Sequence, residues 1–241
     1  MESSPADLRQ DKRIDLTNMF HFGHGSAFGI EPPSQRSLLP PAAGCCASVI
    51  TFCAHASGTH TECGAHILLE GHSLERTFET FPPFVECAVL KVEPERFDTC
   101  GGDTYVGSVP APEGEELVVS KRSIEKALIS ANCSLSSVSA VAVLTLTVDW
   151  VFFTDQAMQF LVNHNIGCLI VDKISIDRER CGPKMPAHRI FFEGRPSAIL
   201  TENIKQDASI KSGIYYLNLQ LSPFLGTDAV PSRVLLFPKV S

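Results

Sequence analysis

One stretch near the middle of the chain constrains the fold most, because it combines two strand patterns with a helix pattern between them. Residues 141–148 are mostly apolar or β-branched, which is typical of a strand. Thr154 and Asp155 are capping residue types ahead of an apolar stretch, and residues 165–167, Asn-Ile-Gly, are typical of a helix end. Residues 168–171 form a second apolar stretch. A strand, a helix and a strand at this spacing make a βαβ crossover, so the sequence predicts an α/β fold with a partly parallel sheet.

Other segments carry further, shorter patterns. Ser120 can cap a helix whose apolar residues share one face, and Asn132 ends it. Residues 21–41 hold many Gly and Pro residues without periodicity, so we expect a long loop of the kind that binds ligands or forms a lid. Residues 1–12 are expected to be a flexible tail before a single domain that runs from residue 13 to 241. Further strands are expected at residues 14–17, 47–53, 85–92, 197–201, 214–219 and 233–237.

The composition is that of a globular protein with a sizeable core: 241 residues, 44% apolar and 20% charged. The net charge of −7, with Lys and Arg scattered along the chain, argues against nucleic acid as a partner. No apolar run is long enough to span a bilayer, and the N-terminus is polar, so the sequence predicts a cytoplasmic protein without a membrane partner. Nine cysteines, an odd number, favour reduced thiols over a disulfide framework.

Three of the eight histidines of the chain lie within residues 55–66, together with a carboxylate. These residues are His55, His60, Glu62 and His66. Imidazole and carboxylate groups are ligands of Zn²⁺ and Mn²⁺, and residues two apart in an extended chain project to the same side. The segment therefore predicts a divalent metal site. A histidine-rich surface loop is the alternative that the pattern alone leaves open.

This segment resembles the signature of the cyclase family of metal-dependent amide hydrolases, to which kynurenine formamidase and isatin hydrolase belong. The signature reads His-x-Gly-Thr-His-x-Asp-x-Pro-x-His. The chain keeps four fixed positions in register, at Gly58, Thr59, His60 and His66, and Glu62 stands where the family has Asp. The match in register thus runs from Gly58 to His66.

Three positions depart from the signature. Gly64 replaces its Pro, Ala56 occupies the place of its first histidine, and His55 lies one residue earlier. A one-residue bulge at Ala56 and Ser57 is expected to bring the His55 ring to the site. Glu62 is longer than the family's Asp by one methylene, about 1.5 Å, so either the backbone shifts or the metal affinity falls.

The resemblance continues through the chain in the family's order. Its counterparts are the opening Asp-Leu-Ser, an Asp-x-x-Ser-x-Asp segment, a later histidine, a Glu-Asn-Leu glutamate, and the closing Leu-Pro-Leu and Gly-x-Asp-Gly-Ala-Pro-x-Arg. They lie at residues 15–17, 171–177, 187–191, 200–204, 221–224 and 226–233. Weak motifs that occur in the right order are together more specific than any one of them.

The resemblance implies a fold, a metal site and an assembly. The fold is a swivelling β/β/α-type single domain, with a mixed sheet barrel and flanking helices. A homodimer or homotetramer is also implied. The metal is Zn or Mn, as one or two ions, with Glu62 bridging them. The implied ligands are His55, His60, Glu62, His188 and Glu202.

The implied activity is hydrolysis of a linear or cyclic amide C–N bond in a small molecule, of the arylformamidase or cyclic amidase type, by metal-activated water. His66 matches the family's substrate-facing histidine, and we expect it to transfer a proton to the leaving nitrogen. Phe20, Phe22 and Phe28 are expected to wall an aryl substrate, and Ser175 to contact it. Packing of these phenylalanines in the core is the alternative.

A second interpretation of the whole chain stays open. Ala56 and Glu62 are also what a degenerate family member would carry, one that serves as a non-catalytic small-molecule binding or scaffold protein with an impaired metal site. His188 would then be an ordinary satisfied histidine, and Glu202 a capping or pairing residue. The metal content of the protein distinguishes the two interpretations.

Overall fold

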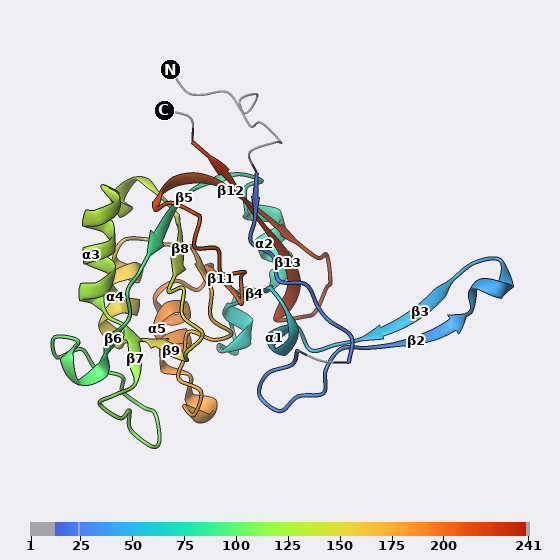
Figure 1. Ribbon diagram of the computed structural model, residues 1–241, viewed down its shortest axis with the longest axis horizontal. Helices are drawn as coiled ribbons and strands as arrows, with labels where there is room; N and C mark the ends of the chain where they lie inside the picture. The colour runs from blue at the N-terminus through green and yellow to red at the C-terminus, as the bar shows by residue number, and fades with distance from the viewer. Residues whose placement is uncertain (1–12, 24, 240–241) are drawn as a thin grey trace.

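Seven strands form a closed barrel in the computed structural model, which describes residues 13–23 and 25–239 (Figure 1). Around the barrel the order is β13, β12, β5, β8, β10, β11 and β4, and β4 pairs back with β13. A short strand, β1, lies beside β13. The expected tail, residues 1–12, lies outside the described residues. The bounds are β1 Ile14–Asp15, β4 His60–Cys63, β5 Val85–Lys91, β8 Ala140–Leu144, β10 Cys168–Val171, β11 Ile199–Glu202, β12 Gly213–Leu221 and β13 Ala229–Pro238.

The predicted crossover is confirmed. β8 and β10 are parallel neighbours, and α4 (Asp155–Asn163) lies between them in the chain. β5 is also parallel to β8, and β11 to β10, whereas the other barrel pairs are antiparallel. β8 ends at Leu144 rather than at residue 148. The backbone N–H groups of Thr145 and Leu146 donate to the carboxylate of Asp172, so the chain leaves the sheet there.

The parallel strands β8, β10 and β11 bury both of their faces. In β8, Val141 and Val143 belong to the core between barrel and helices, and Ala140, Ala142 and Leu144 belong to the core inside the barrel. A strand buried on both faces has a continuous apolar sequence, which is why this stretch lacks alternation. The fold is thus the α/β barrel with flanking helices that the resemblance implied.

Helices cover one side of the barrel, as Figure 1 shows for α3 (Lys121–Ala131), α4 and α5 (Pro186–Gly194). The predicted caps are confirmed: Ser120 accepts a hydrogen bond from the N–H of Ser123, and Thr154 accepts one from the N–H of Ala157. Asn132 ends α3 in the left-handed conformation. No helix within the described ranges is long and apolar enough to cross a membrane.

Residues 21–41 were expected to form a long loop, but the structure shows a strand within them. Within them Ser34–Leu39 forms β2, which pairs antiparallel with β3 (Ala47–Thr51). The resulting hairpin projects from the barrel as an arm (Figure 1), and nearly all of its residues are exposed. The pattern of β2 was missed because its residues Ser-Gln-Arg-Ser are polar and it has no buried face to produce alternation.

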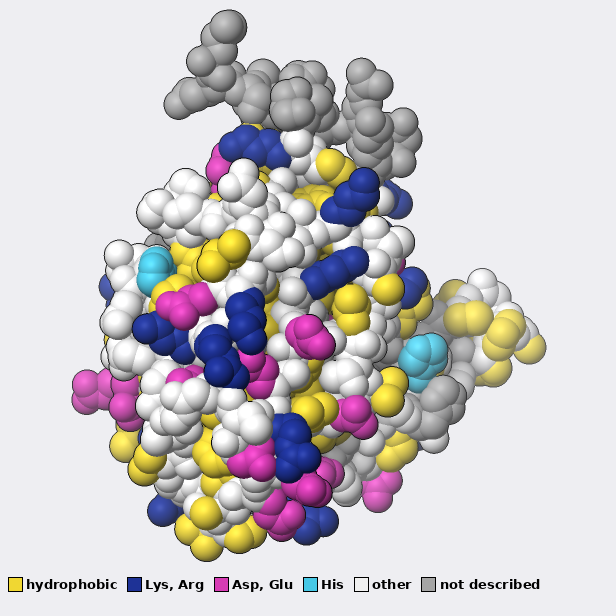
Figure 2. All heavy atoms as spheres, turned by 60° about the vertical axis from the view of Figure 1, so that its left-hand side comes forward, with side chains coloured by type: hydrophobic (Ala, Val, Ile, Leu, Met, Phe, Trp, Pro, Cys, Tyr) yellow, Lys and Arg dark blue, Asp and Glu magenta, His cyan; other side chains and the backbone are white. Residues whose placement is uncertain are grey.

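A second small sheet, formed by β6 (Glu95–Arg96), β7 (Leu117–Val119) and β9 (Val151–Phe153), lies beside the helices. The surface on this side mixes charges of both signs: Figure 2 shows Lys and Arg side chains interspersed with Asp and Glu. Glu95, for example, pairs with Arg122 and Lys126. This face therefore has no broad basic patch.

Candidate metal centre

β4 supplies the centre of the site. His60 and Glu62 are two residues apart in this strand, so their side chains project to the same side. β4 lies between β11 and β13, and its register places His60 directly opposite Glu202 of β11. Nε2 of His60 is 3.5 Å from Oε2 of Glu202. All three side chains are buried, so the closed barrel itself brings these three predicted ligands together.

His188 reaches the same cavity from α5. Its Nε2 lies 2.8 Å from Oε1 of Glu62 and 3.5 Å from Oε1 of Glu202. Its Nδ1 bonds to Asp177, whose carboxylate also accepts the N–H of Ala187 at 2.8 Å and the hydroxyl of Tyr105 at 2.5 Å. Asp177 therefore fixes the orientation of the His188 ring and leaves Nε2 facing the carboxylates.

His55 reaches the site by a different route from the one expected. The predicted bulge at Ala56 and Ser57 is wrong: Ala54–Ser57 form a single helical turn, α1. From this turn, Nδ1 of His55 lies 3.1 Å from Oε2 of Glu62, and Nε2 lies 3.0 Å from Oδ2 of Asp228. In an extended strand, a shift by one residue would turn the side chain to the opposite face, whereas in a helical turn it rotates the side chain by only about 100°. His55, one position before the family's histidine, can therefore still aim its ring into the cavity.

His66 lies in the cavity as expected, but not because the chain is extended. It ends a 3₁₀ turn, η4 (Gly64–His66), that follows β4. Its Nδ1 is 2.7 Å from Oδ2 of Asp228, and its Nε2 is 3.7 Å from Oε2 of Glu62. The ring stacks on that of His55, with 4.2 Å between centroids. The two histidines therefore share Asp228 on one side and Glu62 on the other.

The charges in this cluster depend on one another. Burial opposes ionisation of Glu62, but the charge of His188 beside it holds the pKa of its carboxyl well below the usual range. Burial likewise opposes protonation of His55, but the hydrogen bond to Asp228 and the nearby Glu62 raise the pKa of the ring to about 10. Without a metal ion, protonated rings supply the positive charge that the buried carboxylates require.

The donor atoms fit a divalent ion. Nε2 of His60 is buried and forms no hydrogen bond to any described residue, which is costly unless another group pairs with it. The buried oxygens of Glu62 are paired only with ring nitrogens of His55, His66 and His188, which line the same cavity. Two groups of residues each have donor atoms that all lie within 4.8 Å of one another. The first is His60, Glu62 and Glu202, and the second is His55, Glu62 and His66. Glu62 belongs to both groups, as a bridging carboxylate would. Imidazole and carboxylate donors that converge in this way suit a divalent metal ion.

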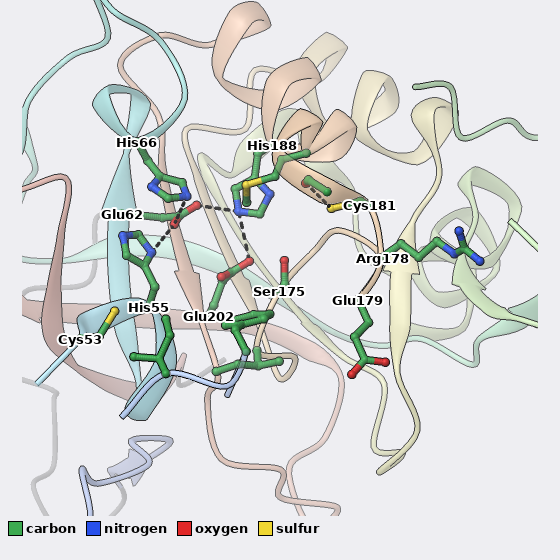
Figure 3. A pocket seen from close by; sticks show the side chains of 15 residues that line it. Cys53, His55, Glu62, His66, Ser175, Arg178, Glu179, Cys181, His188 and Glu202 are labelled. Carbon is green, nitrogen blue, oxygen red and sulfur yellow. Dashed lines mark hydrogen bonds and ion pairs between the residues drawn. The ribbon is translucent and has the colours of Figure 1, made fainter. Parts of the chain in front are cut away.

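A pocket of about 370 Å³ opens onto these donors (Figure 3). Phe28 and Ser175 line it, as expected, but Phe22 is exposed and does not. Phe20 packs against Gly58, where an added Cβ would come within 2.4 Å of its ring, so it supports the backbone beside the site and does not line the pocket. The full lining is Phe28, Ile30, Cys53, His55, Glu62, His66, Ile174, Ser175, Arg178, Glu179, Cys181, Gly182, Met185, His188 and Glu202.

Comparison with known proteins gives a family for this arrangement. The family model described as "Putative cyclase" matches residues 14–178, more than half of the chain. The chain belongs to the cyclase family. No curated protein matches it. The two histidines that this chain shares with the cyclase signature, His60 and His66, thus both lie beside Glu62, and Ala56 stands at the position of the first signature histidine.

Solved structures share the whole cyclase fold at low sequence identity. A "potential metal-dependent hydrolase with cyclase activity" has a TM-score of 0.66 and 20% identity, covering 95% of this chain and 99% of that one. A "predicted metal-dependent hydrolase" from Bacillus stearothermophilus has a TM-score of 0.65 and 22% identity, covering 95% and 98%. Isatin hydrolase A from Labrenzia aggregata, bound to benzyl benzoate, has a TM-score of 0.66 and 13% identity, covering 93% and 92%.

Two carboxylates of this cyclase-family site were not predicted as site residues. Asp177 holds His188, and Asp228 holds His55 and His66. Both lie in segments that resemble family motifs, the Asp-x-x-Ser-x-Asp and Gly-x-Asp-Gly-Ala-Pro-x-Arg stretches. The motifs therefore contained the signal, but the sequence alone does not say which histidine each carboxylate meets.

Proposed function

We propose that this protein is a metal-dependent hydrolase that cleaves a linear or cyclic amide C–N bond in a small molecule. Membership of the cyclase family supports the proposal. One structural observation carries it: Nε2 of His60 is buried without a hydrogen bond, and it lies within 4.8 Å of the carboxylates of Glu62 and Glu202, which line an open, largely apolar pocket. Ligand atoms that converge on accessible space, with an apolar wall beside them, are what such chemistry requires.

His60, Glu62, His188 and Glu202 would hold the ion, with His55 completing the set. Its identity we propose as Zn²⁺ or Mn²⁺, because imidazole and carboxylate are the donors present. When bound, such an ion polarises an amide carbonyl and lowers the pKa of coordinated water. Asp177 holds the ring of His188 in place, as a carboxylate behind a ligating histidine does.

His66 is the residue that we propose for proton transfer. Its Nδ1–H donates to Asp228, so Nε2 is the nitrogen that faces the cavity and can exchange a proton there. Hydrolysis of an amide needs a proton on the departing nitrogen, and an imidazole positioned in the pocket supplies it. Phe28 and Ile30 on the wall exclude water from an apolar substrate group, and Ser175 offers a hydroxyl beside it.

The position of His55 favours an enzyme over a degenerate binding protein. The degenerate interpretation rests on the loss of the first ligand at Ala56. In the structure, Nδ1 of His55 lies 3.1 Å from Oε2 of Glu62, within the distance at which two ligands of one ion are found. The site therefore has a histidine on that side of Glu62.

The test is an assay of hydrolysis with metal supplied. Protein loaded with zinc or with manganese is incubated with formanilide, a linear aryl amide, and with isatin, a cyclic one, and formate release and ring opening are followed. Hydrolysis of at least one substrate is expected, and removal of the metal with a chelator should abolish it. An absence of turnover on both substrates with both metals would contradict the proposed function.

We further propose that the protein works in the cytoplasm. All nine cysteines are free thiols, including the exposed neighbours Cys45 and Cys46. Exposed thiols persist in a reducing compartment and are oxidised elsewhere. Localisation of a tagged protein by microscopy or fractionation tests this.

A further inference from the structure

The residues that line the pocket indicate which charge the substrate carries. This inference rests on the proposed function of the same site. Apart from the candidate ligands and His66, its wall is mostly apolar or sulfur-containing. These wall residues are Phe28, Ile30, Cys53, Ile174, Cys181 and Met185. A wall of this kind accommodates an apolar body, and the few polar groups beside it decide which substituents that body can carry.

Arg178 lines the pocket but is not available to a substrate. Its Nε donates to Oε1 of Glu116 at 2.6 Å, and its Nη1 donates to the carbonyl oxygen of Pro110 at 2.6 Å and to Ser108 at 3.3 Å. In Figure 3 its guanidinium points away from the histidines. No other Lys or Arg is among the lining residues of the described chain. The wall therefore offers no free side-chain cation to a carboxylate on a substrate.

Glu179, the next residue, differs from Arg178 in charge, exposure and pairing. Its side chain is exposed, lines the same pocket and forms no hydrogen bond or ion pair with the described residues. Figure 3 shows its carboxylate turned away from the histidine cluster, on the side of the pocket where Arg178 also lies. A substrate whose amide lies at the metal donors would thus have a negative charge near its far end.

We propose that the substrate is an apolar amide that carries a protonated amine at the end remote from the scissile bond, and that Glu179 is the specificity-determining residue that pairs with this amine. A substrate with a carboxylate at that end is disfavoured, because Glu179 repels it and Arg178 is already paired with Glu116.

Three formanilides that differ only at the 3-position of the ring test this: unsubstituted, aminomethyl and carboxylate. With metal-loaded protein, kcat/KM should be highest for the aminomethyl compound and lowest for the carboxylate. In Glu179→Gln, the ratio of kcat/KM for the aminomethyl compound to that for the unsubstituted one should fall about two- to fivefold, the usual effect of an exposed ion pair. The control Glu193→Gln, an exposed glutamate on α5 outside the pocket lining, should keep the wild-type ratio.

Calorimetry on the same protein keeps the test independent of turnover. The probes are 3-(aminomethyl)aniline and 3-aminobenzoate, and the first should bind more tightly, by a margin that shrinks at high salt. Equal or tighter binding of the benzoate, or an unchanged ratio in Glu179→Gln, would overturn the inference. If neither a formanilide nor isatin is hydrolysed but 3-(aminomethyl)aniline binds selectively, the charge preference stands and the proposed hydrolase activity is wrong.

Discussion

Asp228 joins two histidines of the site through a single carboxylate oxygen. Oδ2 lies 3.0 Å from Nε2 of His55 and 2.7 Å from Nδ1 of His66. The opposite nitrogen of each ring consequently faces Glu62. A carboxylate that holds the outer nitrogen of a ring fixes its tautomer and orientation. Asp228 is thus a positioning residue that acts through both rings.

Replacing this carboxylate should loosen both histidines. We predict that Asp228→Asn lowers zinc affinity about 10- to 100-fold, the usual effect of removing a carboxylate behind metal ligands. Titration with a competing chelator measures the affinity. Asp207→Asn, in an exposed turn away from the site, is the matched control and should bind zinc as the wild type does. Wild-type affinity in Asp228→Asn would show that the rings are held by other contacts.

His66 should be separable from the metal ligands. His66→Ala is predicted to keep its metal but to hydrolyse amides more slowly, by a factor of about 10² to 10⁴, because a positioned proton donor is lost. Metal analysis and kcat are measured on the same preparation. Loss of the metal from this variant would make His66 a ligand, as its place beside His55 and Glu62 also allows.

The turn that carries His66 is held in place by a close backbone contact. Gly64, which begins η4, lies against Gly71, and the N–H of Ala65 donates to the carbonyl oxygen of His72 at 3.3 Å. A Cβ added to Gly71 would lie 2.1 Å from the carbonyl carbon of Gly64. Only glycine permits this approach, so the sequence of the loop after β4 sets the position of His66.

Gly71→Ala should therefore displace this turn. We predict a loss of about 1–3 kcal/mol in the free energy of unfolding, as for other overpacked sites, together with a lower kcat. Urea unfolding gives the first quantity. Gly167→Ala is the control, because its Cβ would meet only atoms at ordinary contact distance, 3.8 Å or more. If the two variants unfold alike, the contact does not hold the turn.

The elements differ in how far the sequence predicts them. The caps Ser120 and Thr154 act over three residues, so local sequence identifies them. The helix α5 was not predicted, although it carries His188, since its residues Pro-Ala-His-Arg-Ile-Phe-Phe lack a capping side chain. The site contacts could not be predicted from spacing: Asp228 is 162 residues from His66, and only closure of the barrel brings them together.

At the scale of the whole molecule, the arm formed by β2 and β3 stands out from a barrel that is otherwise well packed (Figure 1). It exposes Leu38, Leu39, Val49 and Ile50. A two-stranded hairpin alone is marginally stable in water. The arm thus has little buried surface of its own to stabilise it.

The resemblance to the cyclase family leads us to propose a homodimer or homotetramer. Light scattering on the eluting protein should give two or four times the chain mass of 26.2 kDa. The metal-loaded and the metal-free protein should have the same mass, because the arm lies on the outside of the barrel whereas the donors of the metal site are buried. A mass of one chain over the accessible range of concentration would contradict an oligomer.

We propose that His60, Glu62, His188 and Glu202 hold a divalent ion. Elemental analysis of protein soaked in zinc and manganese and then desalted measures this ion. We predict about one or two ions per chain in the wild type, and their loss in His60→Ala together with the activity, because removing a ligand opens the site. A wild-type content below about a tenth of an ion per chain, or an undiminished content in His60→Ala, would contradict it.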